Sequence, residues 1–213
     1  PTELFNITSV FTVFNGDNQI TLRSEDDITI TGGDCPCEEI TGDVTGTTTF
    51  QLDNVQVTDD QTAQLINENF NGVSVGNDIT LSGWQNLAEA GNLSWEGDDF
   101  NSEVFARASA FGSGQSNVKI WLVTPPITIQ GQGETLTFIT KDAFDDGAVL
   151  EVLVSTDYDG SGQPWNFTWE KVCPEISGGN SSGFAGDWQP SGATDISNFV
   201  GTAYIAFRYK GGE

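Results

Sequence analysis

Two tryptophans in loop-like sequence are the residues of this chain best suited to binding a ligand. Trp165 follows a Gly-Ser-Gly-Gln-Pro run, and Trp188 lies between Gly-Asp and Gln-Pro. Such loop-like surroundings do not predict that either side chain is buried in a core. The C–H face of a sugar ring can stack on an indole while nearby amides and carboxylates bind its hydroxyls. These residue types predict a carbohydrate platform. Its expected members are Trp165, Trp188, Tyr158, Asn166, Asp187 and Gln189. The alternative is that both loop tryptophans fold back over the edge of the protein.

The other four tryptophans are expected to pack inside the protein. Trp84, Trp95 and Trp121 belong to short apolar phrases, which favours a core role. Trp169 lies in a strand-like segment and is expected to be half-buried.

The composition argues against an enzyme. The chain has no histidine, which excludes a nucleophile activated by histidine. Carboxylate pairs could support glycoside hydrolysis, and the nominal candidates are Glu68, Asp98, Glu103 and Glu151. With 31 acidic residues, however, chance pairs are common, and no spacing singles out an acid and a nucleophile. We therefore expect no catalytic residues.

The charge balance excludes another class of function. The chain has 31 acidic and 7 basic residues, a formal net charge of −24, and phosphate binding needs Lys and Arg. Nucleic acid is therefore not an expected partner. The acidic surface favours solubility, and local acidic clusters could bind divalent cations. No apolar run is long enough to span a bilayer. The start at Pro1 and the lack of Met and His fit a trimmed, exported protein.

Short strands separated by polar turns are expected along most of the chain. They are residues 65–70, 103–109, 119–123, 134–141, 149–156, 168–172 and 203–209. This pattern, without helices, predicts an all-β fold, a jelly-roll β-sandwich of two antiparallel sheets. Upstream, residues 4–30 alternate like two strands around Asn15-Gly16, a strong hairpin signal. A hairpin alone is marginally stable, so it must either pack on something else or be the remnant of a neighbouring domain, and we favour the remnant.

One further strand-like segment, residues 47–57, precedes the long β pattern. Strict alternation puts Phe50, Leu52, Asn54 and Gln56 on one face and Gln51, Asp53, Val55 and Val57 on the other. The segment could end a preceding unit or fold back to complete the sandwich, and we favour the preceding unit. The expected domains are a hairpin at 1–30, a linker at 31–61 that contains this strand, and the sandwich at 62–213.

The three cysteines allow one internal disulfide with one thiol left over. Cys35 and Cys37 lie in the Gly- and Asp-rich linker, and Cys173 follows a strand. The pairing among them stays open.

A series of phrases from residue 67 onward carries a family resemblance. They are Asn67-Glu-Asn-Phe-Asn-Gly72, Leu81-Ser-Gly-Trp84, Leu93-Ser-Trp95, Trp121-Leu-Val-Thr-Pro-Pro126 and Ile205-Ala-Phe-Arg-Tyr209. Taken in order, residues 62–213 resemble the choice-of-anchor J or cleaved-adhesin group of MAM-like jelly rolls, which occur on bacterial surface proteins. Members of this group normally end in a strand like Thr-Thr-Thr-Phe-Gln-Leu-Asp-Asn-Val, which here precedes the domain. Residues 1–30 more weakly resemble the end of an OB-like domain.

The resemblance implies a non-catalytic carbohydrate-binding or adhesion module of an exported protein at the bacterial outer membrane. Its expected ligand is a glucan-like polysaccharide, and its expected partners are outer-membrane transport or surface proteins. Jelly rolls of this kind often bind a structural Ca²⁺ between their first and last strands. The implied calcium ligands are Asp53, Glu68, Asn69 and Asp98. Two other groups of acidic residues lie at 142–146 and 157–160. We interpret both as turns in preference to calcium-binding loops.

The alternative function is a structural or protein-interaction subunit of an outer-membrane surface assembly. A sandwich that lacks its last strand exposes an edge, and a partner chain could fill that position.

Overall fold

The computed structural model describes residues 5–7, 10–14, 17–21, 28–30, 40–59 and 64–213. The chain divides into two units, Pro1–Glu38 and Glu39–Glu213. None of the described segments is a helix of the length and hydropathy needed to cross a membrane.

The first unit contains two antiparallel strand pairs. Strand β1 (Phe5–Ile7) pairs with β4 (Ile28–Ile30), and β2 (Val10–Phe14) pairs with β3 (Asp17–Thr21). Phe14 is opposite Asp17, so two residues connect β2 to β3, as in the commonest hairpins. This confirms the predicted hairpin. Within the first expected strand, however, β1 and β2 pair with different partners, β4 and β3.

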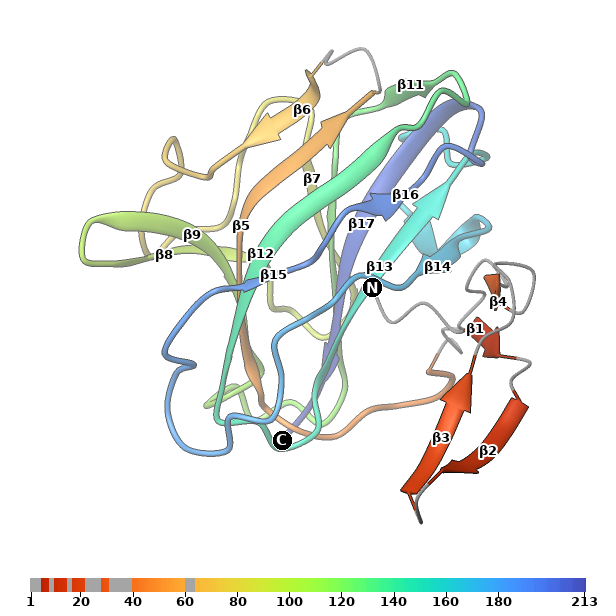
Figure 1. The fold of residues 1–213 in the computed structure, drawn as a ribbon. Helices are drawn as coiled ribbons and strands as arrows, with labels where there is room; N and C mark the ends of the chain where they lie inside the picture. Colours follow the sequence, from red (N-terminus) through yellow and green to blue (C-terminus); the bar gives the residue numbers. More distant parts are fainter. Residues whose placement is uncertain (1–4, 8–9, 15–16, 22–27, 31–39, 60–63) are drawn as a thin grey trace. The chain divides into compact units, whose positions relative to one another are not determined.

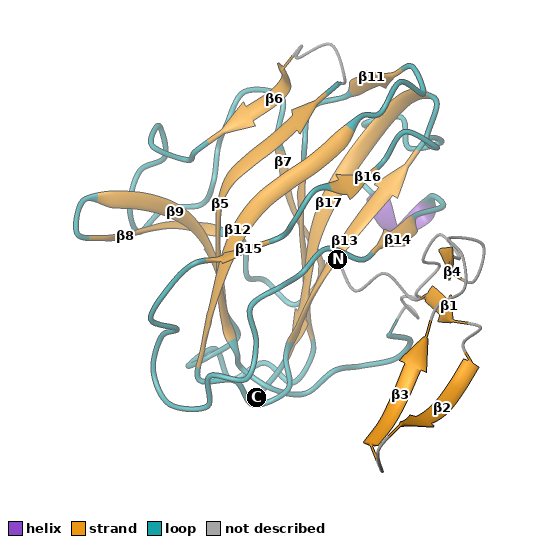
Figure 2. Ribbon diagram, viewed as in Figure 1, coloured by secondary structure: helices purple, strands orange, loops and turns teal. Residues whose placement is uncertain are grey.

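The second unit is a sandwich of two antiparallel sheets (Figures 1 and 2). The first sheet contains β7 (Gln85–Ala90), β10 (Val118–Val123), β11 (Ile127–Ile129), β13 (Val149–Ser155), β14 (Glu170–Val172) and β17 (Gly201–Gly211). The second contains β5 (Thr49–Thr58), β6 (Gln64–Glu68), β8 (Glu96–Phe100), β9 (Glu103–Ala108), β12 (Thr135–Ala143), β15 (Gln189–Pro190) and β16 (Thr194–Asp195). Their orders are β14-β13-β17-β10-β7 and β15-β12-β5-β9-β8. The predicted all-β sandwich is therefore confirmed.

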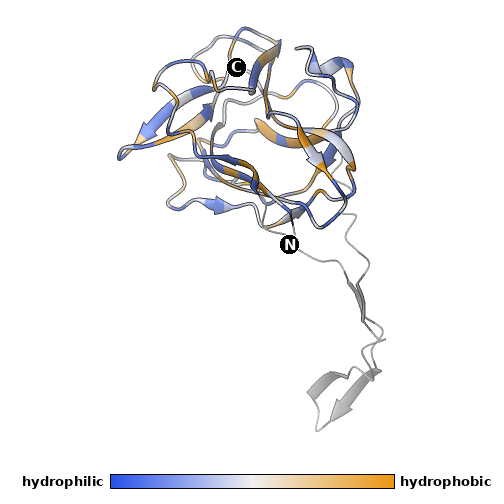
Figure 3. Cartoon of the chain, turned by 90° about the horizontal axis from the view of Figure 1, so that it is seen from above, coloured by the Kyte–Doolittle hydropathy of each residue, from blue (hydrophilic) through white to orange (hydrophobic). Residues whose placement is uncertain are grey.

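The core lies between the sheets and uses alternate residues of their strands. Ile205, Phe207 and Tyr209 point inward from β17, and Phe138 of β12 meets the Phe207 ring edge-on at 5.2 Å. Figure 3 shows hydrophobic and hydrophilic residues mixed along the sandwich strands, as expected where one face is buried and the other is not. Trp95 in the core is fully buried, which confirms its predicted role.

The other predicted tryptophan positions also agree with the structure. Trp84 packs against the core and meets Phe70 edge-on at 5.8 Å. Trp121 is buried in a second apolar cluster rather than between the sheets. Trp169 is half-buried, and its indole N–H donates to the carbonyl oxygen of Pro164 at 2.8 Å.

Strand β5 is central in the second sheet, which corrects the domain boundaries expected from sequence. It lies between β12 and β9 and also pairs with β6 (Figure 1). The segment 47–57 therefore belongs to the sandwich and does not end a preceding unit, and the sandwich begins near residue 39 instead of 62. The physical reason is hydrogen bonding, because without β5 the facing edges of β12 and β9 would lose their backbone partners.

A β-bulge in β5 also overturns the expected strict alternation. Between the pairs Gln56–Thr137 and Asp53–Ile139, β5 contains two residues where β12 contains one. Asn54, at this position, has a φ of 49°. Asparagine is among the few residues besides glycine that adopt this left-handed conformation readily. An extra residue reverses the side-chain phase of every position beyond it.

The bulge allows both halves of β5 to contribute to one core. Phe50 and Leu52 point inward before it, and Val55 and Val57 point inward after it. Under strict alternation these two pairs would lie on opposite faces.

Cys173 forms a disulfide. The other two cysteines, Cys35 and Cys37, lie outside the described residues, so the pairing among the three cysteines stays open.

The bulge gives a test of the fold. We expect Asn54→Val to lower the free energy of unfolding by about 1–2 kcal/mol, because a β-branched side chain is strained at positive φ. Asn54→Gly should stay within about 0.5 kcal/mol of the wild type, because glycine adopts this φ without strain. Urea denaturation measures both. As a control, Gln56→Val places the same side chain in ordinary extended backbone and should not destabilise the protein, and equal losses from both valines would contradict this role of Asn54.

Candidate functional site

A groove of about 410 Å³ lies on the outer face of the second sheet. Its lining consists of Gln51, Asp98, Asp99, Phe100, Glu103, Phe105, Lys141, Phe184, Ala185, Gly186 and Trp188. The floor is built by neighbouring strands, since Gln51 of β5 is opposite Lys141 of β12 and Asp98 of β8 is opposite Phe105 of β9. Three steps between four adjacent strands give the groove a span of about 14 Å. This span suits an oligomeric ligand better than a single small molecule.

One wall of the groove is the segment that leads into β15. Trp188, from this segment, meets Phe105 edge-on with ring centroids 5.7 Å apart. The ammonium group of Lys141 lies 5.1 Å from the centre of the Trp188 ring, and it donates a hydrogen bond to the carbonyl oxygen of Gly186. These contacts fix the indole at the side of the groove while leaving it half-exposed.

A buried carboxylate holds this wall in place. Asp142, at the end of β12, accepts hydrogen bonds from the Ser177 hydroxyl and from the backbone N–H of Asn180. Its neighbour Asp145 accepts from the N–H of Gly179 at 2.7 Å. The backbone carbonyl of Asp142 accepts from the N–H of Ala185 at 2.9 Å. These contacts agree with the predicted turn role of the acids at 142–146, which position the chain beside the groove.

Exposed phenylalanines gather around the groove. The exposed fractions are 66% for Phe100, 53% for Phe184 and 54% for Phe144. Phe144 meets Phe184 edge-on at 6.1 Å, and its φ of 52° is unfavourable for a bulky side chain. Solvent-exposed rings beside a groove add little to folding, so their position favours contact with a ligand. The strained backbone of Phe144 is of the kind that clusters at binding sites.

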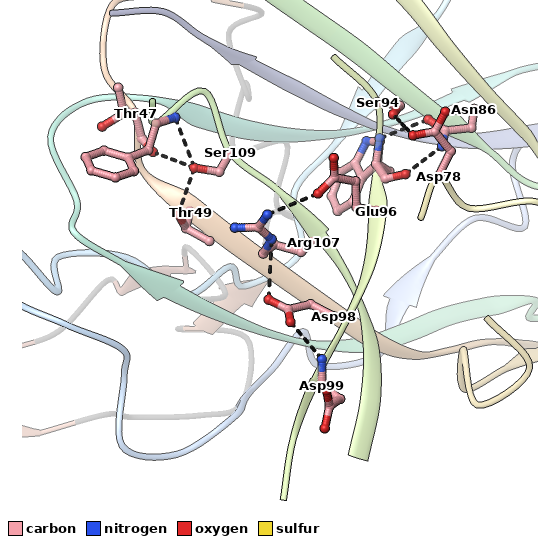
Figure 4. A network of polar contacts seen from close by, with 12 residues as sticks. Thr47, Thr49, Asp78, Asn86, Ser94, Glu96, Asp98, Asp99, Arg107 and Ser109 are labelled. Atoms are coloured by element: carbon pink, nitrogen blue, oxygen red, sulfur yellow. Dashed lines mark hydrogen bonds and ion pairs between the residues drawn. The ribbon is translucent and has the colours of Figure 1, made fainter. Parts of the chain in front are cut away.

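Ionic groups continue along β8 and β9 beside the groove. The Arg107 guanidinium contacts Glu96 at 3.1 Å and Asp98 at 3.4 Å, with all three side chains more than a third exposed (Figure 4). Their oxygens and N–H groups can accept from and donate to hydroxyls. The arrangement thus combines aromatic rings with polar groups of both kinds.

The structure separates the two halves of the predicted carbohydrate platform. Trp188 lines the groove, whereas its chain neighbours Asp187 and Gln189 are not among the lining residues, and the Gln189 amide donates to Glu175 at 2.8 Å. Trp165 instead packs on an apolar cluster that contains Trp121 and Leu153. Residues of this cluster alternate with core residues along the strands of the first sheet, so the cluster covers that sheet's outer face.

Tyr158 and Asn166 lie with Trp165, away from Trp188. Tyr158 is buried in the same apolar cluster, and its hydroxyl donates to Gln85 and accepts from the N–H of Gly162. The Asn166 amide donates to the Gln163 side chain. The expectation of one six-residue platform is therefore wrong, because the two loops cover opposite sheets. Trp165 follows the alternative interpretation, in which a loop tryptophan folds back on the sandwich.

The outer face of the first sheet also carries a buried ionic cluster. The Glu151 carboxylate accepts two hydrogen bonds from Arg208 and contacts Lys210 and Lys171. Burial alone raises the pKa of Glu151, but the charge and hydrogen bonds of Arg208 outweigh burial and lower it. The Ile40 N–H also donates to this carboxylate. Glu151, one of the nominal catalytic acids, is thus held as an ion pair.

Two of the four expected calcium ligands are neighbours in the structure. Asp53 of β5 and Glu68 of β6 lie on paired strands, where Glu68 is opposite Val55. Burial, followed by the negative charges of Glu103 and Glu68, raises the pKa of Asp53 to about 6, although the Asn54 N–H opposes the shift. The Asn69 side chain accepts from the N–H of Asn71, and the Glu68 carboxylate accepts from the N–H of Phe70.

The other part of the expected calcium site is not assembled. Asp98 lies on β8, two strands and about 10 Å from β5, and pairs with Arg107. Across the part of the chain that the structure describes, no three Asp, Glu, Cys or His side chains gather into a metal-binding group. The four predicted ligands therefore do not fit one ion, and calcium binding stays a prediction.

Sequence reasoning missed the phenylalanines and the lysine of the groove. Phe105 and Lys141 lie in segments where apolar and polar residues alternate, as in any half-buried strand. No local pattern indicates that they are neighbours of Trp188. Phe100 was missed because its strand, β8, is rich in Gly and Asp. The only available signal was Phe184 in Gly-Phe-Ala-Gly-Asp-Trp, an apolar residue in a glycine-rich loop.

Comparison of the chain with protein-family models, with curated proteins and with solved structures finds no match. The resemblance to the choice-of-anchor J group therefore stays a prediction from the residues that carry it.

The raised pKa of Asp53 predicts a pH-dependent stability. The unfolded chain loses this proton near pH 3.8 and the folded protein loses it near pH 6, so the free energy of unfolding falls as pH rises between these values. Asp53→Asn removes this titration. We expect the variant and the wild type to be about equally stable at pH 4, and the variant to be more stable by up to about 3 kcal/mol at pH 7.

Urea denaturation at several pH values measures this difference, and a gap that does not change with pH would contradict it. The same assay tests calcium. Added Ca²⁺ that stabilises the wild type but not Asp53→Asn at pH 7 would support ion binding at Asp53. No effect on either protein would remove the calcium prediction.

Proposed function

We propose that the sandwich is a non-catalytic carbohydrate-binding module and that a glycan chain binds in the groove of the second sheet. The observation that supports this most directly is the grouping of Trp188, Phe184 and Phe100 with carboxylates around one groove. Aromatic faces provide stacking surfaces for sugar rings, and carboxylates and amides accept hydrogen bonds from hydroxyls. The module would serve an exported protein at a bacterial surface, in polysaccharide capture or adhesion.

The charge of the groove favours neutral glycans over acidic ones. Asp98, Asp99 and Glu103 line it together with one cation, Lys141, and the whole chain has a net charge of −24. Uronate or sulfate groups would meet a negative surface and be repelled. A neutral, glucan-like polysaccharide is therefore the proposed ligand class.

The alternative role as an assembly subunit has lost its main structural motivation. That role required the sandwich to lack one strand, so that a strand from a partner chain could bind at the open edge. β5 of the same chain occupies the place between β12 and β9. Outer-membrane transport or surface proteins can still be partners of a glycan-binding module, but strand completion is not the reason to expect them.

The proposal is tested by titration calorimetry of the full chain with soluble β-glucans and with an acidic polysaccharide such as alginate. We expect heat of binding with a neutral glucan and none with alginate. Trp188→Ala should weaken glucan binding about tenfold or more, because stacking and groove shape are lost together. If none of the glycans gives heat, the proposed function is wrong.

Trp165→Ala is the matched control for this experiment. The same residue type is removed from the opposite sheet, where Trp165 packs on the apolar cluster. We expect this variant to be less stable to heat but to bind glucan with wild-type affinity. Equal loss of binding in both variants would contradict the assignment to the groove. Phe184→Ala, which removes an exposed ring, separates weaker binding from any loss of stability in Trp188→Ala.

A further inference from the structure

A second, smaller hollow lies on the same outer face, farther along β8 and β9. It has a volume of about 170 Å³, and its lining includes Ser94, Glu96, Arg107, Ser109 and Phe111. None of these residues lines the groove described above. The hollow therefore provides a separate set of contacts on the sheet that carries the groove.

Strand β9 connects the two hollows. Its residues Glu103 and Phe105 line the groove, whereas Arg107 and the adjoining Ser109 line the second hollow. From Phe105 to Ser109 an extended backbone covers about 13 Å. The two hollows are thus consecutive along one strand direction.

The Arg107 group lies at the boundary between the hollows. Arg107 contacts Glu96, which lines the second hollow, and Asp98, which lines the groove (Figure 4). The contact with Glu96 is a hydrogen bond from one of the five N–H donors of the guanidinium group, and the contact with Asp98 is an ion pair. This exposed triad of charged side chains offers both hydrogen-bond donors and acceptors to a polar ligand that crosses it.

Phe111 is held in an exposed position at the far end of this path. Its side chain is 76% exposed, the largest value among the exposed large hydrophobic residues of the described part of the chain. The loop around it is fixed, because the N–H of Ala110 donates to the Tyr209 hydroxyl at 2.9 Å. The Glu213 carboxylate also accepts from the N–H groups of Gly112 and Gly114. A ring that is held in solvent by an ordered backbone is available for stacking at little cost in entropy.

From these contacts we infer that the glycan-binding face extends along β9 from the groove, across Arg107, to a second aromatic subsite at Phe111. The ligand is then an extended polymer segment that occupies both hollows, rather than a chain end bound in the groove alone. This inference rests on the proposed carbohydrate function and adds the length and direction of the bound chain.

The experiment uses the full chain and a length series of neutral β-glucan oligosaccharides, from disaccharide to octasaccharide, measured by titration calorimetry. We expect affinity to rise with length beyond the size that fills the groove. Phe111→Ala should lower the affinity for the octasaccharide about five- to tenfold and leave the affinity for the shortest binding oligosaccharide unchanged.

Val200→Ala is the control, because Val200 is a similarly exposed hydrophobic residue that lines neither hollow. It should not change affinity at any length. Glucan binding without length dependence, or an octasaccharide affinity that Phe111→Ala does not change, would overturn the second subsite while leaving the groove intact. Absence of binding at every length would instead overturn the carbohydrate function itself.

Discussion

Strand β5 has to contribute to the core along its whole length while it forms the middle of a sheet. A two-residue repeat cannot place Leu52 and Val55 on the same face, since they are three positions apart. The extra residue at Asn54 solves this conflict, because its left-handed backbone changes the phase of the strand. Inward residues before and after the bulge then belong to one hydrophobic core. The opposite face of the first half of β5, with Gln51, becomes part of the groove floor.

The two outer faces of the sandwich illustrate how similar residues take different roles. On the first sheet, Trp165, Tyr158 and Trp169 pack together over the strands, and the Tyr158 and Trp169 rings lie 5.5 Å apart. On the second sheet, Trp188 stands at the side of a groove and its neighbours Phe184 and Phe100 remain exposed. Burial makes the first set part of the fold. Exposure beside polar groups makes the second set available to a ligand.

Much of the fold was predictable from local pattern, and the failures have identifiable causes. The seven strands predicted after residue 64 all have counterparts in the structure. The sequence pattern did not predict strands β7 and β8, because they contain few β-branched or aromatic residues. Their sequences are Gln-Asn-Leu-Ala-Glu-Ala and Glu-Gly-Asp-Asp-Phe. Their pairing partners, β10 and β9, impose the strand conformation instead. The assignment of residues 47–57 to a preceding unit failed because sequence order does not reveal which strands become neighbours.

Composition and local periodicity are enough to establish the all-β class, the acidic character, the lack of a histidine-based triad and the presence of residue types suited to sugar binding. Which of those residues lie close together depends on how the strands pair and where the loops pack. Trp165 and Trp188 are 23 positions apart and look alike in sequence, yet they cover opposite sheets. Phe100, Phe105, Lys141 and Trp188 are dispersed along the chain and form one groove only because their strands and loop are adjacent. Strand pairing brings distant residues together through backbone hydrogen bonds, and those bonds carry no signature in the side chains that form a site.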